Sequence, residues 1–128
     1  MGGDFLHERE WGMLLASAKG ATREEIGRVY GVSASRVSAL MRAVIGKLGA
    51  RDVAHAFAVG LALGVFRLDD LHDLEVPATV QEAARDAGVV VPEETRAALN
   101  RGRRAWAETE ERWQKEREST LKALRQGC

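Results

Sequence analysis

Residues 6–66 show a pattern of helical segments and glycines that restricts the fold of this chain more than any other feature. Two amphipathic segments, 22–30 and 33–48, are separated only by Gly31 and Val32. Glycine readily takes the left-handed conformation that ends a helix. A connection of only two residues between the helices is therefore possible at this point. The spacing predicts a helix-turn-helix motif, in which the second helix is shaped to enter a DNA major groove.

Capping residues give the boundaries of the helices expected in this stretch. Thr22 and Glu25 have the spacing of a capping box, and Ser33 is the natural N-cap of the helix that follows the turn. Gly20 and Gly49 end the helices before them. The expected helices are 8–19, 22–30, 33–48 and 52–64.

The apolar residues predict which face of each helix is buried. In the second helix, Ile26, Val29 and Tyr30 are expected to face the core. The third helix has one apolar stripe, made of Val37, Leu40, Met41, Val44, Ile45 and Leu48. Its opposite face carries mostly small side chains, which suits a backbone that approaches another surface closely. The fourth helix is apolar nearly all round, so part of it is an expected interface.

This stretch resembles the LuxR/GerE-type DNA-binding domain, a four-helix unit of bacterial transcription regulators. The resemblance is carried in one register by Leu6, Arg9, Glu10, Leu14, Ala18, Gly20, Thr22, Glu25, Ile26, Gly31, Val32, Ser33, Val37, Lys47, Leu48, Gly49, Arg51, Ala56, Leu61 and Gly64. It implies that the third helix enters the major groove and that the fourth helix pairs two copies as a homodimer.

The resemblance also implies individual contacts. Base or phosphate contacts are expected at Ser35, Arg36, Val37, Ser38 and Arg42, and contacts to backbone phosphates at Thr22, Arg23, Lys47 and Arg51. Dimer or partner contacts in the fourth helix are expected at Ala56, Phe57 and Leu61. Family members usually carry basic residues where this chain has Ser35 and Ser38, and a His in place of Leu40. The groove-facing surface is therefore poorer in charge than the family pattern.

The second half of the chain has fewer signals. The segment 67–77 is acidic and is expected to be a linker, which divides the chain into a helix-turn-helix domain (1–66), a linker and a C-terminal helical region (78–128). Thr79 and Glu82 have capping-box spacing and predict a short helix to about Ala87. Pro92 suits the first position of a long helix that runs to about Arg125.

Leu99, Trp106 and Trp113 recur every seven residues in that long helix. Each indole buries a large area when it is packed, so these residues are expected to form a dimer or partner interface. Three alternatives stay open at this point: the helix packs on its own chain or a second copy, it docks another protein, or it is a largely solvated tail. With only about five residues ahead of the first domain, regulation is expected to act through this tail.

Composition excludes several classes of function. The net charge is zero, but residues 1–68 carry nine Lys and Arg against six Asp and Glu, while residues 69–128 carry ten against thirteen. A basic half joined to an acidic half suits a DNA-binding domain with an appendage. The three His have no ligand spacing and no phosphate-binding loop is present, so we expect no metal, no cofactor and no enzymatic activity. The single Cys128, the absence of a secretory signal and the absence of an apolar span predict a cytoplasmic protein without a membrane segment.

The predicted fold is all-α: a four-helix LuxR/GerE-like domain followed by a short helix and a long C-terminal helix. The leading functional hypothesis is a small transcription regulator, bacterial or from phage, that binds double-stranded DNA as a homodimer. An alternative is a protein-interaction module on a helix-turn-helix frame, which binds a transcription factor or sigma factor and touches DNA weakly. A sigma-factor region-four-like promoter reader is a third hypothesis, since it shares the turn pattern.

Overall fold

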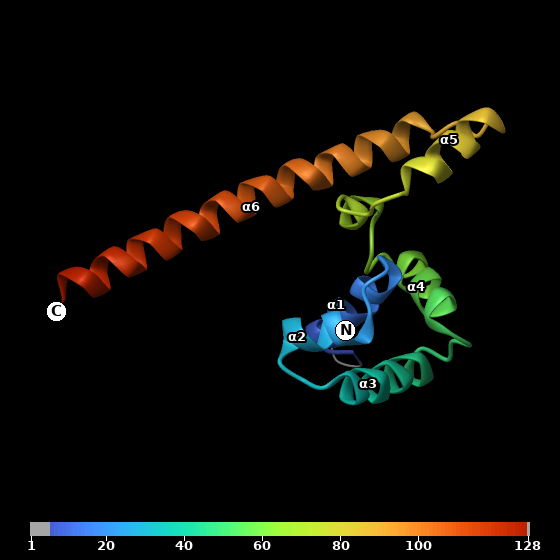
Figure 1. Cartoon of the computed structure of the whole chain (residues 1–128). Coiled ribbons are helices and arrows are strands. Elements are labelled where there is room, and N and C mark those ends of the chain that lie inside the picture. Colours follow the sequence, from blue (N-terminus) through green and yellow to red (C-terminus); the bar gives the residue numbers. More distant parts are fainter. Residues whose placement is uncertain (1–5, 128) are drawn as a thin grey trace. The chain divides into compact units, whose positions relative to one another are not determined.

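The computed structural model describes residues 6–127, and every regular element among them is a helix (Figure 1). The chain divides into two compact units, Met1–Arg67 and Leu68–Cys128. The first unit contains α1 (Glu8–Ala18), α2 (Arg23–Tyr30), α3 (Ala34–Lys47) and α4 (Val53–Ala62). The second contains the 3-10 helix η2 (Leu68–Leu71), α5 (Ala78–Asp86) and α6 (Glu93–Gln126). The predicted all-α fold class is confirmed.

The four helices of the first unit enclose one hydrophobic core. Its fully buried side chains are Leu6, Met13, Leu14, Ile26, Val37, Met41, Val44 and Ala56. The three contributed by α3 are spaced by four and three residues, so they lie on one face of that helix. Leu40, Ile45 and Leu48 flank this face and are partly buried. The stripe predicted for the third helix is therefore confirmed, and it fixes which side of α3 points outward.

The turn between α2 and α3 forms as its sequence predicts. The Thr22 hydroxyl accepts from the Glu25 N–H at 3.1 Å, and the Glu25 carboxylate accepts from the Thr22 N–H at 2.9 Å. The Thr22 backbone N–H, followed by its hydroxyl, lowers the pKa of Glu25. Gly31 ends α2 with a φ of 70°, and the Ser33 hydroxyl starts α3 by accepting from the Arg36 N–H at 3.1 Å. The predicted capping box and N-cap are both confirmed.

The prediction that Val29 faces the core is wrong, since this side chain is 78% exposed. The buried face of α2 lies between Ile26 and Gly27. A side chain at Gly27 would begin 2.5 Å from the Val32 carbonyl oxygen, so the chain after the turn packs directly on this glycine. With Gly27 on the inner side, Val29 is turned toward the outside of the helix.

Helix α4 begins at the Asp52 N-cap, whose carboxylate accepts from the His55 N–H at 2.8 Å. It ends at Ala62, two residues before the predicted end at Gly64. The segment that follows returns Phe66 to the core, where its ring stacks on Phe57 at 5.1 Å and meets Trp11 edge-on at 5.5 Å. These aromatic contacts hold α4 against α1.

One ion pair joins α1 to α3. The Lys47 ammonium lies 3.0 Å from a Glu10 carboxylate oxygen, and the side chains are 45% and 9% exposed respectively. The same carboxylate accepts from the His7 N–H at 3.0 Å at the start of α1. Burial alone raises the pKa of Glu10, but the His7 N–H and the Lys47 ammonium outweigh it, so the pKa is lowered. The carboxylate is therefore held in its charged form at this helix crossing.

In the second unit, η2 packs against α6. The segment predicted to be a linker thus contains a short helix with tertiary contacts. A side chain at Gly102 would overlap the Asp69 carbonyl, so the backbones of η2 and α6 touch at this point. Arg101 pairs with Asp69 at 3.5 Å, and the His72 ring lies 5.7 Å from the Trp106 ring.

Helix α5 differs from its prediction at its start. It begins at Ala78 after Pro77, and no side chain caps it, so the capping box expected from Thr79 and Glu82 does not form. Pro77 already has a fixed φ suited to a helix start, which places Thr79 inside the first turn. Pro92 is likewise the N-cap of α6 rather than its first helical residue. Among its described residues, α5 has no buried side chain.

Replacing Glu10 by Gln is expected to flatten the acid dependence of stability. Because the pKa of Glu10 is lowered on folding, its contribution is present above the unfolded value near 4.5 and is lost as the pH falls through the lower folded value. We expect Glu10→Gln to cost about 1–2 kcal/mol at pH 7 and progressively less below about pH 4. Urea unfolding between pH 3 and 7 measures this. Glu8→Gln, at an exposed position of the same turn, is the control. It should leave the free energy of unfolding at pH 7 and its dependence on pH unchanged.

Adding a methyl group at Gly102 is expected to release η2 from α6. Gly102→Ala places a Cβ inside the backbone of Asp69, so the two elements must separate. Hydrogen exchange of residues 68–74 should then become faster. Gly127→Ala, at the C-cap of α6, meets the Ala123 carbonyl oxygen at 3.4 Å and should leave the exchange of residues 68–74 unchanged. Unchanged exchange in Gly102→Ala would contradict the packing described here.

Candidate nucleic-acid interface

Helix α3 presents a smooth outer face. Because its core residues all lie on one side, the opposite side of the helix points outward. Ser35, Ala39 and Gly46 lie at helical spacing along this outer side. Nothing lies within 4 Å of the position that a Cβ would take at Gly46. A second surface can therefore approach the α3 backbone closely along this side.

Arg42 lies on this face and Arg36 lies beside it. Arg36 and Arg42 are both exposed, and no ion pair involves either among the described residues. Guanidinium groups in this state can donate two hydrogen bonds to a guanine edge or pair with a phosphate. Ser35 is exposed and Ser38 is half-buried beside them.

The prediction that the Val37 side chain contacts DNA is wrong. Its side chain is fully buried between α1, α2 and α3, because it is the first residue of the inward stripe. A side chain in that position contributes to the orientation of α3 and cannot itself touch a ligand on the outer face.

The remaining predicted phosphate contacts lie at separate places on the unit. Lys47 is half exposed and already paired with Glu10. Thr22 is exposed at the start of α2, where its hydroxyl is used as a cap. Arg23 donates to the Ser17 hydroxyl at 3.3 Å, and Arg51 is exposed in the turn before α4.

A basic groove runs between α1 and α3, and its lining includes two residues that sequence reasoning missed. It is lined by His7, Arg9, Glu10, Met13, Val32, Arg36, Leu40, Ala43 and Lys47. His7 is the N-cap of α1 and Arg9 belongs to its first turn, where the Arg9 guanidinium lies 5.8 Å from the centre of the Tyr30 ring. The only sequence signal for Arg9 was its place in the family pattern. Its proximity to Arg36 depends on how α1 and α3 cross.

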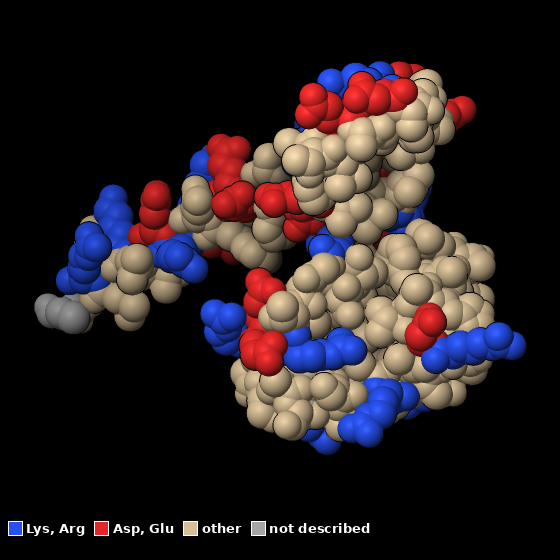
Figure 2. Space-filling model, turned by 45° about the vertical axis from the view of Figure 1, so that its right-hand side comes forward, with Lys and Arg blue, Asp and Glu red and all other residues tan. Residues whose placement is uncertain are grey.

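Figure 2 shows the Lys and Arg side chains spread over the face of the first unit that it displays, separated by uncharged residues. Acidic side chains lie among them. The surface is thus basic at a few points and does not carry a continuous positive field.

The predicted α4 interface residues have three different environments. Ala56 is fully buried in the core and is corrected to a core residue. Phe57 is partly buried and stacks on Phe66. Leu61 is 37% exposed and shares one exposed face with Ala54 and Ala58, spaced by four and three residues. This face is the part of α4 that remains available for pairing.

The predicted interface residues of α6 also lie in different environments. Leu99 is half-buried near η2, while Trp106 contacts His72 and meets Trp113 edge-on at 5.7 Å. Trp113 is 58% exposed. The two indoles therefore mark the point where the cover provided by η2 ends.

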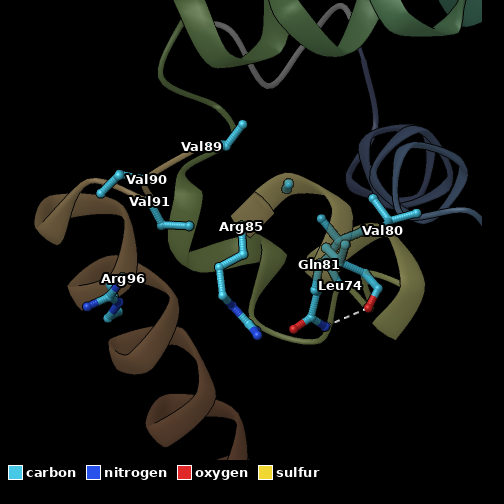
Figure 3. Close-up of a pocket in the computed structure, with 10 residues that line it drawn as sticks. Leu74, Val80, Gln81, Arg85, Val89, Val90, Val91 and Arg96 are labelled. Carbon is cyan, nitrogen blue, oxygen red and sulfur yellow. Dashed lines mark hydrogen bonds between the residues drawn. The ribbon is translucent and has the colours of Figure 1, made fainter. Parts of the chain in front are cut away.

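An open apolar groove lies at the start of α6 (Figure 3). Its walls come from the segment after η2, from α5 and from residues 89–91, and its lining includes Leu74, Val76, Val80, Ala84, Val89, Val90 and Val91. Arg85 and Arg96 border it, and Gln81 is held by a 2.7 Å bond to the Val76 carbonyl. Most of these aliphatic side chains are exposed.

No cluster of three or more His, Cys, Asp or Glu suited to a metal ion occurs among residues 6–127. Within the same residues, no helix is both long and apolar enough to cross a membrane. Cys128 lies outside the described part of the chain.

The four-helix arrangement, the two-residue turn and the outward α3 face agree with one sequence comparison. Residues 4–59 match the luxR family of bacterial regulatory proteins. The first unit therefore carries a luxR-family helix-turn-helix domain, and domains of this family bind DNA and regulate transcription. No curated protein and no solved structure matches the chain. The family resemblance expected from the sequence is confirmed for this segment.

Proposed function

We propose that this protein is a transcription regulator that binds double-stranded DNA as a homodimer, with α3 in the major groove and α4 pairing two copies. The outer face of α3 carries this proposal. Its small side chains let the helix backbone approach the base edges, and Arg42 on this face and Arg36 beside it supply the charge-assisted donors. Arg9 and Arg23 add positive charge near the ends of α1 and α2.

The exposed face of α4 supports the dimer. Ala54, Ala58 and Leu61 form an apolar strip on a helix whose other side is anchored by Phe57 and Phe66. Two such strips can pack closely because alanine lets the helices approach. A two-fold pair of luxR-type domains would read two half-sites related by the same symmetry.

A second candidate is a regulator that acts by binding another protein. The apolar groove of the second unit favours it, since several aliphatic side chains there are exposed on an element without buried residues. Specific DNA binding at nanomolar concentration by the purified chain alone would support the first candidate. DNA binding that appears only when a second protein is added would support this one.

Removing both arginines of α3 is expected to weaken specific DNA binding strongly. Arg36→Ala combined with Arg42→Ala should weaken affinity for a footprinted genomic site by about a hundredfold or more, since each base-contacting arginine contributes about 1–3 kcal/mol. Mobility-shift titrations at several salt concentrations measure the affinity and its salt slope. Arg85→Ala combined with Arg112→Ala removes the same charge from the second unit and should leave affinity within about threefold. Equal effects of the two double variants would contradict a role for α3.

Placing a charge in the α4 strip is expected to weaken the dimer. Leu61→Lys buries an ammonium group if the strips pair, so the dimer dissociation constant should rise about tenfold or more. Sedimentation equilibrium of the full chain measures this constant. Val29→Lys introduces the same side chain at the exposed apolar position of α2 and should leave the constant unchanged.

A further inference from the structure

The C-terminal part of α6 has an apolar stripe that its own unit leaves uncovered. Every described residue from Glu110 to Gly127 is exposed. Trp113 and Leu121 lie on the same side of the helix, eight residues apart, and Leu124 continues that side. The first part of the same stripe, Leu99 to Trp106, is the part that packs near η2.

The charges of this part of α6 are separated along the helix, with Glu110 of the acidic part and Arg125 of the basic part next to the stripe. Residues 107–114 carry three Glu and one Arg, a net charge of −2. Residues 115–126 carry four Lys and Arg and two Glu, a net charge of +2. Figure 2 shows the basic side chains gathered near the C-terminal end of the helix and acidic ones before them.

A helix with this charge pattern is complementary to itself only in one direction. In a parallel pair, the acidic part faces a second acidic part and the basic part faces a second basic part. In an antiparallel pair, each acidic part faces the basic part of the other helix. Opposed helix dipoles add to the same preference.

We propose that residues 110–126 of α6 pair with the same residues of a second copy in an antiparallel, two-fold symmetric helix pair. The overlap is 17 residues, or about 25 Å of helix. Trp113 of each chain packs against Leu121 and Leu124 of the other, so the bulky indole meets smaller side chains. The two-fold axis passes near residues 117–119. This inference specifies the homodimer of the proposed function and rests on that part of it, but it is independent of DNA binding.

The pairing is tested by sedimentation equilibrium of the full chain carrying Leu61→Lys, which removes the contribution of α4. Adding Leu121→Glu should weaken the remaining dimer about tenfold or more, because it places a carboxylate in the seam. Ser119→Glu adds the same charge on the outer side of the helix and should change the constant by less than about threefold. Ser119 and Leu121 are both exposed in their own unit, so circular dichroism should show both variants folded. A monomer at about 100 μM before either change, or equal effects of the two, would overturn the proposal.

The direction is tested by charge reversal. Glu110→Lys reverses an acidic charge next to the stripe and should weaken the pair. Adding Arg125→Glu to the same chain should restore it, since opposite charges again face each other. In a parallel pair like charges would face each other both before and after the first change, so a dimer that this change leaves unaffected would overturn the antiparallel arrangement.

Spin-label distances provide an independent measure of direction. In a Cys128→Ser chain, single labels are placed at Ser119 near the proposed axis and at Glu108 near the end, both on the outer side of α6. An antiparallel pair separates the Glu108 labels by at least about 10 Å more than the Ser119 labels, because each residue from the axis adds about 3 Å along the pair. Equal distances at the two positions would overturn the proposal. Either result leaves the DNA-binding test with Arg36 and Arg42 unaffected.

Discussion

The burial of one face of α3 is the interaction on which the rest of the first unit depends. Val37, Met41 and Val44 have no appreciable exposure, and they fix the rotation of the helix about its own axis. A rotation by one position would expose an apolar residue and bury Arg36 or Arg42 without a partner, which is costly. The smooth outer face and the positions of both arginines are thus consequences of core packing.

The Glu10–Lys47 pair adds a second constraint on the same helix. It ties the last turn of α3 to the first turn of α1, and the His7 N–H keeps the carboxylate charged. Lys47 therefore has a structural role besides any contact with a phosphate. Since its ammonium is 45% exposed, a bound anion can still reach it from the solvent side.

The second unit lacks a comparable core. Among its described residues only Ala98 and Gly102 are buried, at the contact of η2 with α6. Its apolar side chains gather instead in the groove beside α5 and along α6, where they remain exposed. The α6 pairing proposed above would bury part of this surface, which the single chain leaves exposed.

The sequence by itself determined the helices, the turn at Gly31 and the luxR-type frame, because caps and apolar spacing act within a few residues of each other. It did not reveal that Val29 points outward, that Val37 and Ala56 belong to the core, or that η2 occupies the expected linker. It also gave no sign that Glu10 pairs with Lys47 or that Arg9 and Arg36 line the same groove. Those features depend on how helices distant in sequence cross, and only the tertiary structure decides that.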